Sequence, residues 1–398
     1  MSADRIASEV ANRFAPAPLT SGPVYFDCAA TTPVDPRVWA AMAPHALGET
    51  ANAGSSRHDY GRRARQAVER ARAQVARAAG ATRGEVIFTS GATESNNLAI
   101  LGLAAWGEET RRRHLVSTAI EHRAVLEPLR ELERRGFEVT LVPPTPGGWV
   151  DPDRVRAAVR PDTLLVSVMH VNNETGVIQP LAAIAAALAD HDAYLHVDAA
   201  QGFGLLSPEL HQRRIDLISI SGHKFHAPQG IGALVARRRD GRRPPLAPLM
   251  HGGGQELGLR PGTLPVPLIV GLGEAARLAS AEREERVARC REMGRWLREQ
   301  LAPLRPRYHG DPERVAPHLL CLSFPGLDAE TVIEAWADLV AVSHGAACTT
   351  ALATCSHVLA AMEVDEETAA GAIRLSWCHR TPRPDAAALV HAIRQAAR

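Results

Sequence analysis

The sequence predicts an α/β fold in which a large domain with a mainly parallel sheet is joined to a smaller α+β domain. From residue 85 onward, apolar or β-branched segments end in polar residues and are followed by amphipathic segments, as in alternating strands and helices. The chain has 398 residues, which is long for one domain. Beyond about residue 283 its character changes to a long helix followed by separate apolar segments.

Five apolar segments predict the strands of the large domain. They span residues 85–90, 114–119, 163–170, 193–201 and 216–224. Because the carboxyl ends of parallel strands share the edge at which ligands bind, polar residues near these ends should meet there. They are His122, Asn173, Asp198 and Lys224. A helix should begin just after Gly91, with Thr93 or a neighbour as its cap.

Two helices and three further strands complete the predicted elements. A helix over 62–79 has an inward face of Ala64, Val68, Ala71, Val75 and Ala78. A helix over 281–301 has a buried stripe of Val287, Cys290, Met293, Leu297 and Leu301. Segments 318–327, 339–345 and 372–378 predict strands of the smaller domain. We assign 1–22 to an N-terminal tail, 35–283 to the large domain, and 23–34 with 284–398 to the small domain.

Composition excludes several classes of function. The formal net charge of +1 argues against the basic surface that direct nucleic-acid binding requires. No apolar stretch is long enough for a membrane span, and residues 1–22 lack a signal peptide's apolar run, which predicts a cytoplasmic protein. Six cysteines without CxxC pairing predict free thiols, no disulfide framework and no metal site.

Lys224 is the only lysine among the 45 lysine and arginine residues. Arginine replaces lysine electrostatically, but a guanidinium stays protonated and does not condense with an aldehyde. A single retained primary amine therefore indicates covalent imine chemistry, although a surviving surface lysine is the simpler alternative.

The neighbours of Lys224 favour an imine cofactor, which needs an anion opposite its ring nitrogen and a flat group against the ring. Asp198 is a candidate for the anion, although an aspartate there can instead cap the next helix. His122 can lie over the ring and carry protons, or it can simply begin a helix. Ser221, His223 and the helix start after Gly91 can surround a phosphate.

Taken together in this order, these motifs resemble the class V aminotransferase superfamily, specifically cysteine desulfurases of the NifS/IscS type. The resemblance is carried by YFDCAATTPVDPRV, SGATESNNLAI, EH at 121–122, SVMHVNNETGVIQP, HVDAAQ, SGHKFHAPQGIGAL, HGGGQELGLRPGTLPV, SHGAACTT and AIRLS. It implies the fold of pyridoxal-5′-phosphate (PLP) dependent transferases, whose large domain has a mainly parallel seven-stranded sheet.

The resemblance also implies roles for individual residues. Lys224 would hold PLP covalently, Asp198 would pair with its ring nitrogen, and His122 would stack on the ring. The phenolic oxygen would be bound by Gln201 and Asn173. The phosphate would be held by Ala92, Thr93, Ser221 and His223, and by Thr263 from the second subunit of a homodimer.

The same resemblance implies the substrate and the reaction. Arg374 would anchor the carboxylate of L-cysteine, with Asn52 nearby, although a structural salt bridge is another role for Arg374. Cys348, in a stretch of small residues, would attack the substrate sulfur, release alanine and keep a persulfide for a sulfur-acceptor protein. Cys355 is a candidate second carrier before a helix start at Ser356.

Several alternatives stay open. Iron–sulfur assembly, tRNA thiolation and DNA phosphorothioation all need such an acceptor. A selenocysteine lyase, another PLP lyase or a transaminase would share most of these residues. The alternative that is not an enzyme is a PLP-bearing adaptor that assembles a sulfur-transfer complex.

Overall fold

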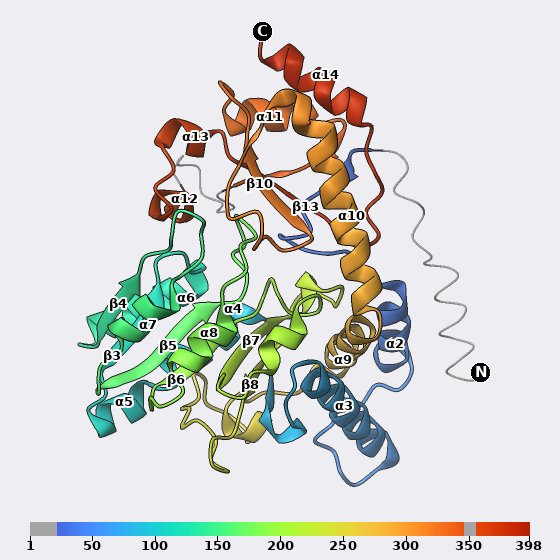
Figure 1. The fold of residues 1–398 in the computed structure, drawn as a ribbon. Helices are drawn as coiled ribbons and strands as arrows, with labels where there is room; N and C mark the ends of the chain where they lie inside the picture. Colours follow the sequence, from blue (N-terminus) through green and yellow to red (C-terminus); the bar gives the residue numbers. More distant parts are fainter. Residues whose placement is uncertain (1–21, 346–355) are drawn as a thin grey trace.

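The computed structural model describes residues 22–345 and 356–398 (Figure 1). Most of the predicted N-terminal tail, together with Cys348 and Cys355, therefore lies outside the described residues. Of the helices in the described part of the chain, none is long and apolar enough to cross a membrane.

The large sheet has seven strands in the order β2-β8-β7-β6-β5-β3-β4, which confirms the predicted architecture. β8 is antiparallel to its neighbours β2 and β7, and the other pairs are parallel. The strands are β2 (Val86–Thr89), β3 (His114–Thr118), β4 (Glu138–Val142), β5 (Thr163–Met169), β6 (Tyr194–Asp198), β7 (Leu217–Ser221) and β8 (Gly232–Ala236). Five of them are the predicted strands, and β4 and β8 are additional.

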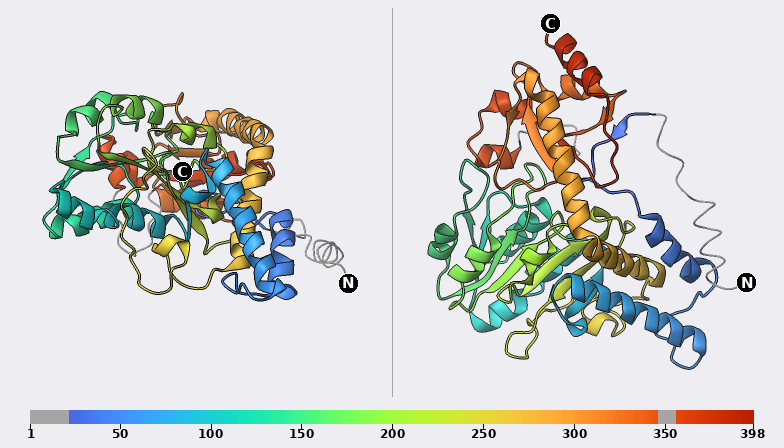
Figure 2. Two further views of the ribbon diagram at one scale, coloured as in Figure 1. Left: turned by 90° about the horizontal axis from the view of Figure 1, so that it is seen from below. Right: turned by 45° about the vertical axis from the view of Figure 1, so that its right-hand side comes forward.

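Helices cover both faces of this sheet (Figures 1 and 2). One core packs α4 (Ala92–Leu101), α5 (Ala104–Thr110) and α6 (Arg123–Arg134) against residues such as Ile87 and Leu115. The other core packs the opposite face against α2 (Pro36–Leu47), α3 (Asp59–Ala78), α7 (Pro152–Ala158), α8 (Leu181–Ala187) and α9 (Val266–Ala281). Strand residues alternate between the two cores, because successive side chains point to opposite faces.

Both predicted helices are present. The inward residues predicted for α3 are all buried, and so is the predicted stripe of α10 (Arg283–Leu301), which confirms Cys290 as a core residue. The cap predicted for α4 was wrong, because Gly91 occupies that position and no side chain caps the helix. The first-turn N–H groups of α4 are therefore left for another acceptor.

The C-terminal part of the chain contains a four-stranded sheet in the order β12-β13-β10-β9. These strands are β9 (Arg307–Tyr308), β10 (Leu319–Ser323), β12 (Ser343–His344) and β13 (Ile373–Ser376). Near it, β1 (Val24–Tyr25) pairs with β11 (Val340–Ala341), so residues close to the N-terminus join the C-terminal part. The remaining helices are α11 (Ala329–Trp336), α12 (His357–Ala361), α13 (Glu366–Ala370) and α14 (Ala386–Ala396). The predicted division into two domains near residue 283 stays a prediction.

Candidate active site

A cavity of about 560 Å³ lies at the carboxyl edge of the large sheet. It is lined by ten of the thirteen predicted site residues, which come from the start of α4, the ends of β6 and β7, the segments after β3, β5, β6 and β7, and β13. They are Ala92, Thr93, His122, Asn173, Asp198, Gln201, Ser221, His223, Lys224 and Arg374. The fold thus brings into one space residues that are up to 282 positions apart (92 to 374).

Lys224 lies in the short turn Gly222–Lys224 that follows β7. Its Nζ donates to the carbonyl oxygens of Ala29 at 2.5 Å and Ala30 at 2.8 Å. Burial lowers the pKa of the ammonium to about 8, and the positive charge of Arg374 adds to this effect. A lowered pKa makes the neutral, nucleophilic amine accessible near neutral pH, so Lys224 differs from an ordinary surface lysine.

Asp198 ends β6, and two neighbours fix its carboxylate. Oδ2 accepts from Asn96 Nδ2 at 2.7 Å, and Oδ1 accepts from the backbone N–H of Ala200 at 2.9 Å. The side chain faces the cavity from a residue only 5% exposed. A carboxylate held in this way is a fixed negative charge that can pair with a protonated ring nitrogen.

His122 is the N-cap of α6, and its Nδ1 accepts the backbone N–H of Ala124 at 3.1 Å. This bond places the proton of the neutral imidazole on Nε2. Burial lowers the pKa of His122, and the charge of Lys224 lowers it further while Asp198 opposes the shift. His122 therefore caps α6 and also presents its ring to the cavity, where it can stack on a planar ligand.

The phosphate end of the predicted site is formed by Gly91 and by the backbone N–H groups at the start of α4, which no side chain caps. Gly91, with φ of +156°, precedes α4, and a Cβ added there would come within 3.7 Å of Ser221 Oγ. His223 Nδ1 lies 3.1 Å from Thr31 Oγ1, and burial lowers the pKa of His223 to about 4. The positive end of α4 and the Ser221 hydroxyl therefore line a space suited to a phosphate dianion.

Arg374 reaches the cavity from β13, on the strand face opposite Ile373 and Leu375, as predicted. Its Nη2 bonds Asp27 Oδ1 at 2.7 Å and its Nη1 bonds the carbonyl oxygen of Asn173 at 2.9 Å. The buried Nε has no partner among the residues that the structure describes. The guanidinium is thus held in place by a salt bridge while it lines the cavity, so the salt bridge does not exclude the predicted carboxylate-anchoring role.

Two predicted residues that the structure describes do not line this cavity. Asn52 and Thr263 are exposed, and Asn52 Oδ1 accepts the backbone N–H of Gly54 at 2.8 Å. Cys348 lies outside the described residues.

The residues present fit PLP. An amine with a lowered pKa, a fixed carboxylate, a neutral imidazole and an uncapped helix start surround one cavity, and Asn96 Oδ1 is buried there without a partner among the residues described. These are the groups that bind the aldehyde, the ring nitrogen, the ring face and the phosphate of that cofactor.

Comparisons with known proteins agree with this chemistry. The aminotransferase class-V family model matches residues 24–389. The cysteine desulfurase IscS of Methylococcus capsulatus is 46% identical over 364 residues, which cover 91% of this chain and 89% of that protein.

Solved structures give the same result. DndA from Streptomyces lividans is 52% identical, with a TM-score of 0.78 over 89% of this chain and 99% of its own. SspA, solved in complex with cysteine, is 36% identical, with a TM-score of 0.78 over 90% of this chain and 100% of its own. The chain therefore belongs to the class-V aminotransferase family, and within it to the PLP-dependent cysteine desulfurases.

Proposed function

We propose that this protein removes the sulfur of L-cysteine, releases L-alanine and keeps the sulfur as a persulfide on Cys348 for transfer to an acceptor protein. The observation that carries the proposal is the convergence of Lys224, Asp198, His122 and Arg374 on one cavity. An amine for the cofactor, an anion for its ring, a proton carrier and a carboxylate anchor are the groups that this reaction needs.

When bound at Lys224, PLP supplies a ring that withdraws electrons from the substrate α-carbon. Asp198, which Asn96 holds in place, keeps the ring nitrogen protonated. Arg374 binds the α-carboxylate and orients the substrate. The Nζ of Lys224, once free, takes the α-proton, and Nε2 of His122 is the second group in the cavity that carries a proton.

Sulfur transfer then uses the Cys348 thiolate. Its sulfur attacks the substrate Sγ, an S–S bond forms, and the Cβ–Sγ bond breaks. The electron pair of the broken bond stays on the carbon side, which gains a proton and leaves as L-alanine. The outer sulfur of Cys348 is then open to attack by a thiolate of the acceptor protein.

Mass spectrometry of the intact protein after addition of L-cysteine tests this proposal. We expect one extra sulfur atom per chain, located on the peptide that contains Cys348 and removed by dithiothreitol. Extra sulfur on Cys355 would favour a relay between the two thiols. Alanine formation without any added keto acid distinguishes the reaction from transamination, and cofactor binding without alanine release would favour an adaptor.

The lowered pKa of Lys224 predicts how cofactor binding depends on pH. A group with a pKa of about 8 is roughly one quarter neutral at pH 7.5, against about 0.1% for an unperturbed lysine. The rate of PLP incorporation into the apoprotein should therefore rise up to about pH 8 and then level off. Stopped-flow absorbance measures this rate, with Nα-acetyl-lysine as the control amine. A rate that still rises roughly tenfold per pH unit above pH 9, as with the control, would contradict the proposed environment.

We also propose a homodimer in which Thr263 reaches the partner's phosphate site. Thr263 is exposed in the single chain, and the apolar side chains of Trp39, Leu47 and Leu257 are 46%, 72% and 54% exposed. Removing such apolar side chains from water would favour association, and two-fold dimers are the commonest homo-oligomers.

Mixing two defective variants tests this arrangement. Thr263→Ala should weaken cofactor binding, and Lys224→Arg should be inactive. If Thr263 acts across the dimer, each mixed dimer has one complete site, and the mixture should recover about a quarter of wild-type activity. No recovery above the Thr263→Ala level, after confirmed subunit exchange, would place Thr263 outside the partner's site.

The acceptor and the compartment complete the proposal. Iron–sulfur assembly, tRNA thiolation and DNA phosphorothioation are the pathways that such a persulfide can supply, through an acceptor thiol rather than through direct nucleic-acid contact. Cys28, Cys290, Cys321 and Cys378 are free thiols. Free thiols suit a reducing compartment, and we place the enzyme in the cytoplasm.

A further inference from the structure

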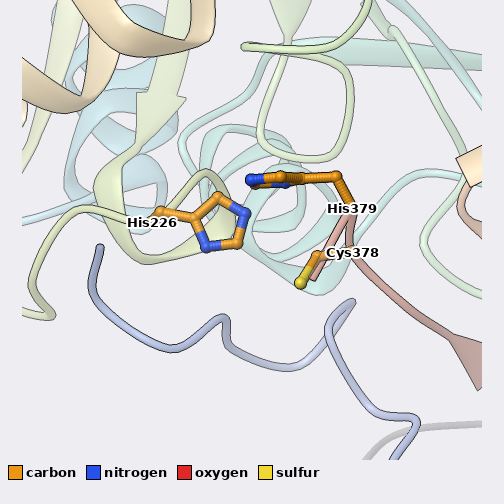
Figure 3. A group of neighbouring side chains, drawn as sticks. All are labelled: His226, Cys378 and His379. Atoms are coloured by element: carbon orange, nitrogen blue, oxygen red, sulfur yellow. The ribbon is translucent and has the colours of Figure 1, made fainter. Parts of the chain in front are cut away.

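A second group of reactive side chains lines a small pocket that Lys224 also lines. His226, Cys378 and His379 each present a nitrogen or sulfur atom, and these atoms all lie within 4.8 Å of one another (Figure 3). His226 comes from the loop after β7, and Cys378 and His379 lie just beyond the end of β13 at Ser376. The sequence spacing predicted no metal site, because 152 positions separate the two segments (226 to 378).

His226 is oriented as a metal ligand requires. Its Nδ1 lies 2.9 Å from the carbonyl oxygen of Pro33, which only accepts, so Nδ1 carries the proton and Nε2 keeps a lone pair. Such a bond from the second ring nitrogen fixes tautomer and ring orientation in metal sites. The backbone of His226 has a φ of +73°, and its N–H donates to Thr32 Oγ1 at 2.8 Å. A non-glycine residue held in this conformation is uncommon and is enriched at functional sites.

Cys378 brings a sulfur atom to the group. Thr381 Oγ1 donates to Cys378 Sγ at 3.6 Å and accepts the backbone N–H of Cys378 at 3.0 Å, so two contacts hold this residue in place. Cys28 lines the same small pocket and offers a further sulfur atom.

His379 completes the group. Its ring packs edge-on against that of His226, with centroids 5.1 Å apart, and Figure 3 shows their nitrogen-bearing edges close together beside the Cys378 sulfur. His226 is buried, and His379 lines the same small pocket. Arg286 lines the same small pocket, but Glu282 pairs with it at 2.8 Å and offsets its charge.

We propose that His226, Cys378 and His379 bind one Zn²⁺ ion, with the Cys28 thiol as the fourth donor. Two imidazoles and two thiols are a ligand set that Zn²⁺ takes in tetrahedral sites, where ligand atoms lie roughly 3.3–3.8 Å apart. His226, Cys378 and His379 therefore have to draw together slightly around the ion, and Cys28, which is not part of their 4.8 Å group, has to approach further. Each thiol that binds loses its proton to solvent as its sulfur–zinc bond forms, so no oxidant or reductant is needed.

Zinc at this position would also fix the segment whose carbonyl oxygens accept hydrogen bonds from Lys224. Cys28 precedes Ala29, whose carbonyl oxygen accepts from both Lys224 Nζ and Gln201 Nε2. His226 lies two residues after Lys224. The ion would join the segments that contain Cys28 and His226 and would stabilise their arrangement around Lys224.

Zinc titration of the PLP-loaded protein tests the proposal. The protein is stripped of metal with a chelator, kept reduced, and titrated with Zn²⁺ against a chromophoric chelator. We expect one tightly bound ion per chain, and at least tenfold weaker binding in Cys378→Ser and in His379→Ala, since even the loss of an outer partner weakens metal sites by about 10–100-fold. Cys290→Ala, a buried thiol from the same pocket, and a Cys348→Ser/Cys355→Ser double variant are the controls that should keep the affinity.

Cobalt substitution gives a readout that does not depend on the variants. Co²⁺ bound to the wild-type protein should show the visible bands of tetrahedral cobalt and a thiolate charge-transfer band. The absence of stoichiometric zinc binding, an octahedral cobalt spectrum, unchanged affinity in both single variants, or loss of binding in the Cys348/Cys355 double variant would each overturn the proposal. Circular dichroism and the PLP absorbance establish that each variant is folded, and neither readout depends on desulfurase activity.

Discussion

Replacing Lys224 with arginine should abolish cysteine desulfuration although the positive charge is retained. Arginine does not condense with the cofactor aldehyde, and its guanidinium does not take the α-proton at neutral pH. General acid–base catalysis alone contributes about 10²–10⁴-fold. Because the covalent role is lost as well, we expect kcat/KM to fall by at least roughly 10⁴-fold.

The composition of the chain makes the result of this experiment easy to assign to one residue. Lys224 is the only lysine in the 398-residue sequence, so no second lysine side chain competes for the cofactor aldehyde. After treatment with borohydride, wild-type protein should carry reduced cofactor on the Lys224 peptide, and Lys224→Arg should carry none there. Lys224→Ala with added methylamine is the matched control, because a small amine restores part of the proton transfer to a cavity that the shorter side chain leaves open. Retained cofactor absorbance and activity in Lys224→Arg would contradict the assignment.

The central strands were predictable because they are buried along all or nearly all of their length. β5, β6 and β7 are apolar runs that end in polar residues at one edge. β4 was missed because it lies at the edge of the sheet, and its residues are a mixture of exposed, intermediate and buried. β8 was missed because it follows the Lys224 turn and pairs antiparallel with β7, so no helix separates the two strands.

The candidate site was likewise only partly predictable from the sequence. Asp198 and Lys224 follow strands and could be read locally, whereas the residues that hold them in place could not. Asn96 bonds Asp198 from 102 positions away, and the Ala29 carbonyl accepts from Lys224 across 195 positions. Asp27, which pairs with Arg374, is 347 positions distant. Such partners carry no periodicity or spacing, and they are found only when the fold brings the segments together.

Replacing Cys348 with alanine should stop sulfur transfer while leaving the cofactor site intact. The residues proposed to bind the cofactor are Lys224, Asp198 and the start of α4, all of which belong to the large sheet and its loops. The absorbance of the bound cofactor and its shift on addition of L-cysteine should therefore be unchanged. Alanine release should fall by about 10³-fold or more, because no thiolate is present to accept the sulfur.

This separation of binding from turnover distinguishes the candidate functions. A selenocysteine lyase, or a PLP lyase that releases free sulfide, would keep most of its activity with L-cysteine in Cys348→Ala. A persulfide enzyme would lose alanine formation and persulfide together. Cys355→Ala is the matched control: if Cys348 is the primary acceptor and Cys355 a relay, Cys355→Ala should form the first persulfide at the normal rate and lose only onward transfer. Wild-type alanine release in Cys348→Ala would exclude the persulfide mechanism while leaving Lys224 as the cofactor residue, because the two residues act in separate steps.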